Sequence, residues 1–347
     1  MLSLQQLKRA TTLSLLPIAA ALLPANAQAA EVNIYSYRQA FLIEPILNAF
    51  TAETGIKANV VFAKSGLIER LENEGKNSQA DLVLTADTGT LFDVVNRGLT
   101  QSIQSPVIDA NVPAQYRDPE QQWVALTARS RIVYAAKDRV KPGELKTYEE
   151  LADPKWKGRI CTRSGKHSYN LSLIGAMIAH HGEAETETWL EGLKANLARK
   201  PQGNDRAQVK AVKEGVCDLA LGNTYYFGKM LNNTKETEQV AWAKSVNLIF
   251  PNQDDRGAHM NITGAALTKF APNRDAAIKL FEFLSGAKAQ EMYAQVNYEF
   301  PVRPGTPLAG LVKEYMSGFK GDDLNLAEVA KNRTAAAKLV DKVGFDN

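Results

Sequence analysis

The stretch from residue 122 to residue 135 constrains the fold more than any other, because it is too long for one ordinary β-strand. An average strand has about 5–6 residues. Arg129, Ser130 and Arg131 interrupt this largely apolar run with a polar break. The pattern therefore predicts two strands in series, and a segment of this kind can cross between two lobes of a protein.

A second crossing is expected further along the chain. Strands predicted over 246–251 and 265–268 lie on either side of it. The 347 residues are enough to bury two cores. Because the chain crosses twice, each lobe should be discontinuous. We expect an N-terminal lobe of residues 30–128 plus about 252–302, and a C-terminal lobe of about 129–251 plus 303–347.

The first part of the expected N-terminal lobe has a β-α-β pattern. Residues 31–38 alternate apolar and polar side chains as a strand does, a helical pattern then ends near Gly55, and residues 60–62 form a second short strand. This order is typical of a parallel sheet covered by helices. The predicted fold class is α/β, with two lobes that each contain a helix-covered mixed sheet and are joined by two crossing strands.

The first 29 residues have the pattern of a secretory signal peptide. Lys8 and Arg9 supply the charged start, residues 10–23 form the apolar run, and Ala27 and Ala29 flank a small-residue cleavage site. No other stretch approaches the ~18 apolar residues of a membrane span. We expect cleavage near Ala29 and an exported, periplasmic protein that is not embedded in the membrane.

Composition and motifs exclude several classes of function. The formal net charge of +3 is too small to indicate a nucleic-acid partner. The sequence contains no nucleophile motif, no zinc-binding His-Glu motif and no Walker loop. We therefore expect a binding protein and no enzyme, acting as a monomer.

Two stretches of the chain repeat the order strand, polar turn, tyrosine and helix. Residues 215–221 predict a short buried strand, after which Tyr225 and Tyr226 begin a helix. In the other stretch, a strand ending at Cys161 precedes Tyr169 and the next helix. Packing alone would explain a single Tyr-Tyr pair at a helix start, so the second, matching stretch is what favours a binding site.

The two cysteines share the spacing of the tyrosines. Cys161 lies eight residues before Tyr169, and Cys217 lies eight residues before Tyr225. If the two strands are neighbours in one sheet, the cysteines could form a disulfide while the tyrosines converge at the carboxyl ends of the strands, where open α/β sheets bind ligands. Such a disulfide needs Cα atoms within about 7 Å, which spacing alone does not establish.

Ferric iron is the ligand that best explains several converging phenols. It is a hard, trivalent cation that prefers anionic oxygen, and a bound cation can hold a phenol in its phenolate form. Three phenolates would neutralise its charge and leave coordination positions open. An arginine could hold a small anion bidentately in those positions. Arg129, at the polar break, is placed for that role.

Several short motifs, taken together and in this order, resemble one family over the whole mature chain. They are residues 33–39, 126–131, 158–170, 198–203 and 222–226. The sequence resembles the periplasmic ferric-ion-binding proteins of bacterial iron ABC transporters, and in particular the members that bind iron through tyrosines and a synergistic carbonate.

The resemblance implies a fold, a cargo, an anion and a partner. The fold is the two-lobed type II fold of periplasmic binding proteins. The cargo is Fe³⁺, with Tyr169, Tyr225 and Tyr226 as its ligands. Arg129 is the main contact of the anion, which is carbonate or bicarbonate by the resemblance, although citrate or another oxyanion would satisfy the same physics. The partner is the inner-membrane iron ABC permease that receives the iron.

One motif departs from this family. Many relatives have His or His-Tyr near the end of the first strand, whereas this chain has Arg38, Gln39 and Ala40 there. This departure predicts that iron is held by one lobe and the anion, with the cleft left open or closed only through weaker contacts. Other side chains expected to line the cleft or support the ligands are Tyr37, Arg38, Gln39, Arg131, His167 and Asn223.

Two rival functions remain at this point. The same cleft could bind an anion or a small organic solute, since the fold alone does not exclude it. An exported redox enzyme is the second rival, although no acid-base pair accompanies the tyrosines.

Overall fold

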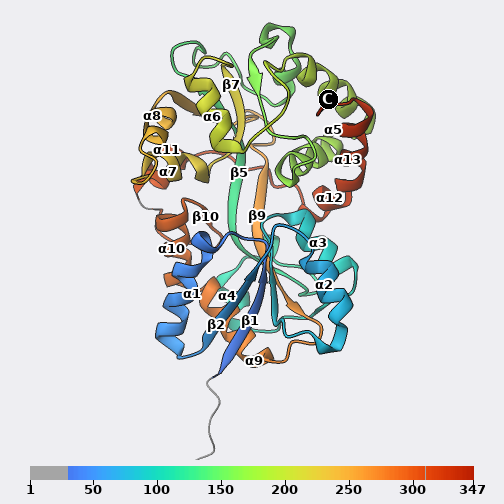
Figure 1. Ribbon diagram of the computed structural model, residues 1–347, viewed down its shortest axis with the longest axis vertical. Coiled ribbons are helices and arrows are strands. Elements are labelled where there is room, and N and C mark those ends of the chain that lie inside the picture. The colour runs from blue at the N-terminus through green and yellow to red at the C-terminus, as the bar shows by residue number, and fades with distance from the viewer. Residues whose placement is uncertain (1–29, 309) are drawn as a thin grey trace, which may run out of the picture.

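The computed structural model describes residues 30–308 and 310–347, so the expected signal peptide lies outside the described residues. Figure 1 shows two lobes, one above the other, with strands β5 (Val124–Ala136) and β9 (Met260–Thr268) passing between them. Among the described helices, none is long and apolar enough to cross a membrane.

The lower lobe is built on the expected β-α-β unit. β1 (Glu31–Ser36) lies parallel to β2 (Lys57–Phe62) on one side and to β3 (Leu82–Leu84) on the other. α1 (Ala40–Thr54) connects the first two strands and ends at Gly55, whose left-handed backbone suits a residue without a side chain. The other elements that follow in this lobe are α2 (Leu67–Glu74), α3 (Thr88–Asn96), β4 (Thr100–Gln101) and α4 (Pro106–Asn111).

The crossing segment is one continuous strand and not two in series. β5 is buried along its whole length and changes partners at the expected break. Its first half pairs with β9 as far as Ser130, and its second half pairs with β7 (Leu219–Asn223) from Arg131 onwards. The polar residues therefore mark the hinge between the lobes without interrupting the strand.

β9 provides the second crossing. It runs antiparallel to β5 and also pairs with β3 and β4 of the lower lobe. The predicted strand on the other side of the crossing is β8 (Val246–Ile249), which pairs with the end of β5 in the upper lobe. The full path of the sheet is β2-β1-β3-β9-β5-β7-β6.

The upper lobe contains two parallel neighbours, β7 and β6 (Ile160–Cys161), each followed by a helix. The long helix α5 contains a break at Gly182, where two helices meet at an angle. The helices of this lobe before the second crossing are α5 (Ser168–Ala195), α6 (Asp205–Lys213), α7 (Tyr225–Leu231) and α8 (Glu238–Lys244).

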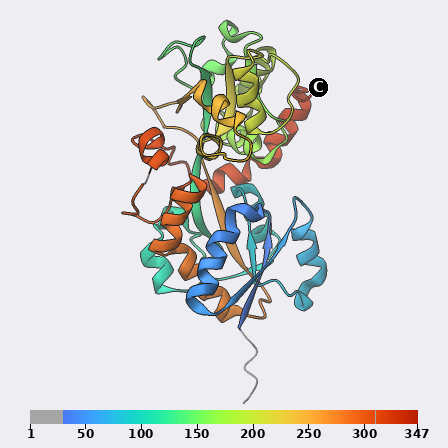
Figure 2. The same cartoon turned by 60° about the vertical axis from the view of Figure 1, so that its left-hand side comes forward.

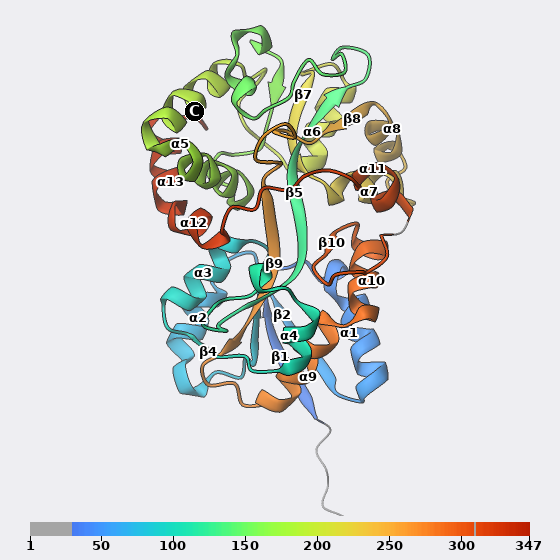
Figure 3. The ribbon, with the colours of Figure 1, turned by 180° about the vertical axis from the view of Figure 1, so that it is seen from behind.

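After β9 the chain completes the lower lobe and then returns to the upper one. Figures 2 and 3 show the last helices beside α5. We propose lobe boundaries near residues 128, 252 and 302, as expected from the sequence. The elements after β9 are α9 (Arg274–Ser285), α10 (Ala287–Asn297), β10 (Phe300–Pro301), α11 (Gly310–Met316), α12 (Leu326–Lys331) and α13 (Arg333–Lys342).

Candidate metal centre

The floor of the candidate site is the pair of parallel strands β6 and β7. Ile160 lies opposite Leu219 in the strand register. Cys161 and Cys217 form a disulfide whose Cα atoms are 5.9 Å apart. Two predictions are thus confirmed: the two strands are neighbours in one sheet, and the two cysteines form a disulfide.

The tyrosines that follow these strands converge, as their spacing predicts. Tyr169 lies in the first turn of α5, and Tyr225 and Tyr226 begin α7. The hydroxyl oxygens of Tyr169 and Tyr225 are 3.1 Å apart, within hydrogen-bond distance. The rings of Tyr225 and Tyr226 lie with their centroids 4.3 Å apart. Three phenols from two helix starts therefore meet at the carboxyl ends of two parallel strands.

The turn before Tyr225 is held closely against β5. Gly222 leaves room for the ring of Tyr134, because a Cβ at this position would lie 2.3 Å from that ring. The Tyr134 hydroxyl donates to the carbonyl of Asn223 at 2.6 Å. On the hinge side, the Ser130 amide donates to the Thr224 hydroxyl at 3.3 Å. These contacts fix the direction in which α7 starts.

The phenols of the Tyr-Tyr pair hold their protons strongly in the metal-free protein. Burial raises the pKa of Tyr225 well above that of a free phenol, and the neighbouring phenols add to the effect. Burial likewise raises the pKa of Tyr226. A cation that binds to the phenolate forms of these two tyrosines must therefore displace their protons.

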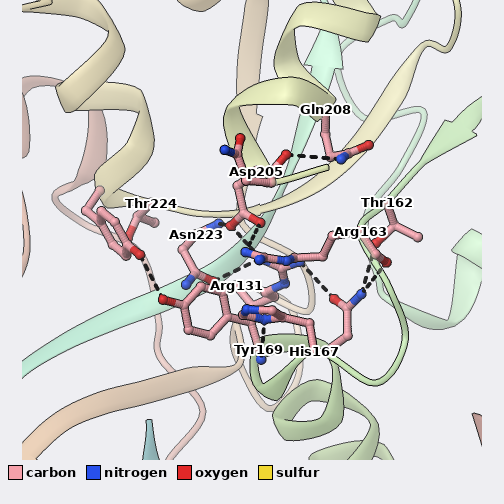
Figure 4. A network of polar contacts seen from close by, with 12 residues as sticks. Arg131, Thr162, Arg163, His167, Tyr169, Asp205, Gln208, Asn223 and Thr224 are labelled. Atoms are coloured by element: carbon pink, nitrogen blue, oxygen red, sulfur yellow. Dashed lines mark hydrogen bonds and ion pairs between the residues drawn. The ribbon is translucent and has the colours of Figure 1, made fainter. Parts of the chain in front are cut away.

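A buried ionic network supports Tyr169 from behind, as Figure 4 shows. Arg131 donates to the Asp205 carboxylate at 2.7 Å, and Arg163 donates to its other oxygen at 3.1 Å. Burial opposes the charge of Asp205, but the two guanidiniums hold the pKa of this carboxyl below its usual value. Asn223 joins the network, since its side-chain oxygen accepts from Arg131 at 3.1 Å.

His167 supports the tyrosine through the backbone. Its Nδ1 accepts from the Tyr169 amide at 3.2 Å, which caps the start of α5. Burial, followed by the charge of Arg163, lowers the pKa of His167 to about 4, so the imidazole is neutral at neutral pH. Its ring centroid lies 4.5 Å from that of Tyr169. The predicted supporting role of His167 thus has a structural basis in this cap.

Arg129 reaches the site from the hinge strand. Its guanidinium donates to the Thr263 hydroxyl at 2.9 Å and to the Ala86 carbonyl, both in the lower lobe. Its Cζ lies 5.8 Å from the centroid of the Tyr169 ring. Its Nε is buried and has no partner among the described residues. Arg129 is therefore beside the phenols and retains a free donor.

Residues 38–40, which differ from the pattern of many relatives, give the lower-lobe side of the site no His or Tyr side chain for a metal. Arg38 is buried and forms an ion pair with Glu299, and it also donates to Thr263 at 2.6 Å. The hydroxyl of Tyr37 accepts from the Ile68 amide at 2.8 Å. Arg38, Tyr37 and Gln39 all line the cavity.

These groups surround a cavity of about 60 Å³ between the lobes. Its lining includes residues that the sequence analysis did not single out, notably Arg206, Phe41 and Glu299. Arg131, His167 and Asn223 are not among the lining residues and act from behind Tyr169. Within residues 30–308 and 310–347, no cluster of three or more His, Cys, Asp or Glu side chains could hold a metal.

Comparison with known proteins identifies the family. A family model described as bacterial extracellular solute-binding protein matches residues 77–317. The chain belongs to this family. Among its solute-binding relatives, iron uptake protein A1 of Synechocystis sp. is 43% identical over 91% of this chain and 87% of the relative.

Solved structures of ferric-ion-binding proteins have the same fold as this solute-binding protein. The apo ferric ion-binding protein A of Pasteurella haemolytica superimposes with a TM-score of 0.88 at 50% identity, covering 92% of this chain and 99% of the other. A Trichodesmium protein in complex with iron and citrate gives a TM-score of 0.85 at 40% identity, with 91% and 99% covered. The fold is the two-lobed type II fold, as the sequence predicts.

Proposed function

We propose that this solute-binding protein captures ferric iron in the periplasm through Tyr169, Tyr225 and Tyr226, together with a synergistic anion, and delivers it to an inner-membrane ABC permease. The observation that carries the proposal is the convergence of three phenols, with two hydroxyls 3.1 Å apart, at the ends of parallel strands. The names of the relatives support the cargo, since they include an iron uptake protein and ferric-ion-binding proteins.

The chemistry of the donors suits ferric iron. Phenolates are hard, anionic oxygen ligands, and three of them neutralise a trivalent cation. The remaining coordination positions would take an anion held by Arg129, whose guanidinium matches an oxyanion geometrically. Because the lower lobe has an Arg38–Glu299 ion pair in place of the ligands of other relatives, we propose that iron is held by one lobe and the anion.

The size of the cavity favours a small anion. A volume of about 60 Å³ gives room for roughly four water-sized groups, whereas sites for organic ligands usually measure roughly 300–1,000 Å³. Carbonate is a small oxyanion of the size that this volume favours, and we propose it as the synergistic anion. The rival function, binding of an organic solute in the same cleft, fits less well. We further propose that the protein acts as a monomer, catalyses no reaction, and loses its signal peptide near Ala29.

An absorption titration tests the proposal. Metal-free mature protein is mixed with ferric chloride in bicarbonate, and a visible phenolate-to-iron charge-transfer band is expected. Tyr225→Phe should weaken or shift the band, whereas Tyr116→Phe, a tyrosine outside the cavity lining, should leave it unchanged. A wild-type protein that stays colourless and retains no iron would refute the proposal and leave an anion or organic solute as the ligand.

A further inference from the structure

Three arginines line the cavity, and two of them are already engaged. Arg38 is paired with Glu299, so these two side chains cancel each other's charge. Arg129 donates to Thr263 and to a backbone carbonyl across the hinge. Neither guanidinium is free to turn entirely toward a ligand.

Arg206 is the third, and it differs from the other two. It is half-buried in the first turn of α6 and lines the same cavity as the three tyrosines. Across the described parts of the chain, nothing forms a hydrogen bond or an ion pair with it. Its neighbour Asp205 is buried and fixed by Arg131, which anchors the start of the helix beside the site. A cation is thus placed at the cavity with no protein partner.

The charge balance among the residues that line the loaded site favours such a cation. Three phenolates neutralise Fe³⁺, but a carbonate adds two negative charges. Arg129 supplies one positive charge. Arg131 and Arg163 share the single carboxylate of Asp205, so this network has one surplus positive charge, but it lies behind the Tyr169 ring and outside the cavity lining. Because a charge in a desolvated cleft is costly unless it is paired, a second cation that can contact the anion directly is favourable.

We propose that Arg206 is a second contact of the synergistic anion and forms a two-arginine clamp with Arg129. The clamp selects a small oxyanion with two negative charges, since the unpaired guanidinium of Arg206 can donate two parallel hydrogen bonds to one edge of it and Arg129 still has its Nε free to donate. The inference rests on the proposed function, because it requires that iron binds at the tyrosines. It extends that function by naming the residue that makes iron retention dependent on a dianion.

The test measures how much anion the iron complex needs. Metal-free protein in carbon-dioxide-free buffer receives one equivalent of ferric chloride and is titrated with sodium bicarbonate, and the charge-transfer absorbance is recorded. Arg206→Gln should keep a band, because the phenols remain, but should need about tenfold more bicarbonate or more for half-maximal absorbance, as expected for a lost hydrogen bond to a charged group. Arg206→Lys keeps the positive charge but lacks the paired donors of a planar guanidinium, so it should need an intermediate bicarbonate concentration.

Arg274→Gln is the matched control, because Arg274 is an exposed arginine in the first turn of another helix. It should bind as the wild type does. If Arg206→Gln forms the band at the wild-type bicarbonate concentration, the inference is wrong while the iron function stands. If Arg206→Gln does not fold, the same result for Arg206→Lys overturns the inference. A wild-type protein without any band would instead overturn the proposed function, and the inference with it.

Discussion

The phenols of Tyr225 and Tyr226 must lose their protons before they can act as anionic ligands of a trivalent cation. Burial raises the pKa of both groups, so both are protonated in the metal-free protein at neutral pH. Iron and protons therefore compete for the same oxygens. Binding releases protons, so the affinity for iron should rise with pH and fall with acidification, by up to roughly tenfold per pH unit for each proton released.

Proton release on addition of ferric chloride to bicarbonate-containing protein, recorded by pH-stat, checks this dependence. Tyr225→Phe should release one proton fewer than the wild type. Conversion of bicarbonate to carbonate releases the same amount in both proteins and therefore cancels in the comparison. Equal proton release from the two proteins at equal iron loading would mean that iron does not displace a proton from Tyr225, or that an iron-bound water loses one in its place.

Buried His259 makes the stability of the protein sensitive to acid. Its Nε2 lies 2.9 Å from the Ser172 hydroxyl at the hinge, and burial lowers its pKa to about 3. The unfolded chain, with a histidine pKa near 6.5, takes up a proton below that pH while the folded chain does not. The free energy of unfolding should therefore fall as the pH drops from about 6.5 toward 3, by up to about 1.4 kcal/mol per pH unit.

His259→Asn removes this group, and urea unfolding at several pH values measures the difference. The variant should lose less stability than the wild type between pH 6.5 and pH 4. His167, whose pKa is about 4, contributes in the same direction in both proteins. Parallel curves for the two proteins would assign the acid sensitivity to other groups.

Single residues also show where sequence reasoning ends. Tyr169 and Tyr225 were predictable as a pair because their spacing from Cys161 and Cys217 is equal. Glu299 was not, because its partner Arg38 lies 261 positions away and nothing local distinguishes either residue. Arg206 stands out only once the structure shows which arginines of the cavity already have partners.

At the scale of the elements, the disulfide joins Cys161 in β6 to Cys217, two residues before β7 begins. Cys161 and Cys217 are 56 positions apart, and closing a loop of this length removes about 4 kcal/mol of unfolded-chain entropy in the polymer model. The double substitution Cys161→Ser, Cys217→Ser should lower the free energy of unfolding by a similar amount. Thermal and urea unfolding measure it.

Reduction of the wild-type protein with a thiol provides an independent comparison for this prediction. It should move the unfolding midpoint toward that of the double variant and leave the double variant unchanged. A wild-type midpoint unaffected by reduction would mean either that the disulfide adds little to stability or that the thiol cannot reach it. In the first case the double variant unfolds at the wild-type midpoint, and in the second it unfolds earlier.

The predicted interruption of β5 shows why element boundaries are harder to predict than elements. In sequence, Arg129 and Arg131 are polar residues in an apolar run, which is typical of a turn. In the structure both are buried, because partners from distant segments, Thr263 and Asp205, satisfy their guanidiniums. A burial pattern that depends on such contacts cannot be recognised from the local sequence.

At the scale of the whole molecule, Lys229 links the lobes beside the cleft. From α7 of the upper lobe, its ammonium donates to the Val296 carbonyl of α10 at 2.7 Å and lies over the Phe41 ring. Lys229→Met keeps most of the apolar stem and removes the donor. The metal-free variant should therefore open more readily and give a larger radius of gyration by small-angle X-ray scattering.

Lys288→Met is the control for this effect, because Lys288 pairs with Glu53 inside the lower lobe. It should scatter as the wild type does. Indistinguishable scattering from Lys229→Met and the wild type would mean that other contacts, such as those of α12 with α3, hold the lobes together.

The two-lobed α/β architecture was predictable because it rests on periodicity and on two long-range crossings that leave visible patterns. The β-α-β opening, both crossings and the strand neighbours of the tyrosines were all found where they were expected. The relative position of the lobes was not, because it depends on side-chain contacts such as Arg129 with Ala86.

The three proposed iron ligands all belong to one lobe, and this has a kinetic consequence. When ligands come from two lobes, separating the lobes breaks metal bonds, and the dissociation rate follows the opening rate. With the proposed ligands, the lobes could separate while all three oxygen–metal bonds stay intact. The residence time of the cargo would then be set by exchange of the anion and reprotonation of the phenols, so a receiving protein would have to change the chemistry of the site and not only its shape.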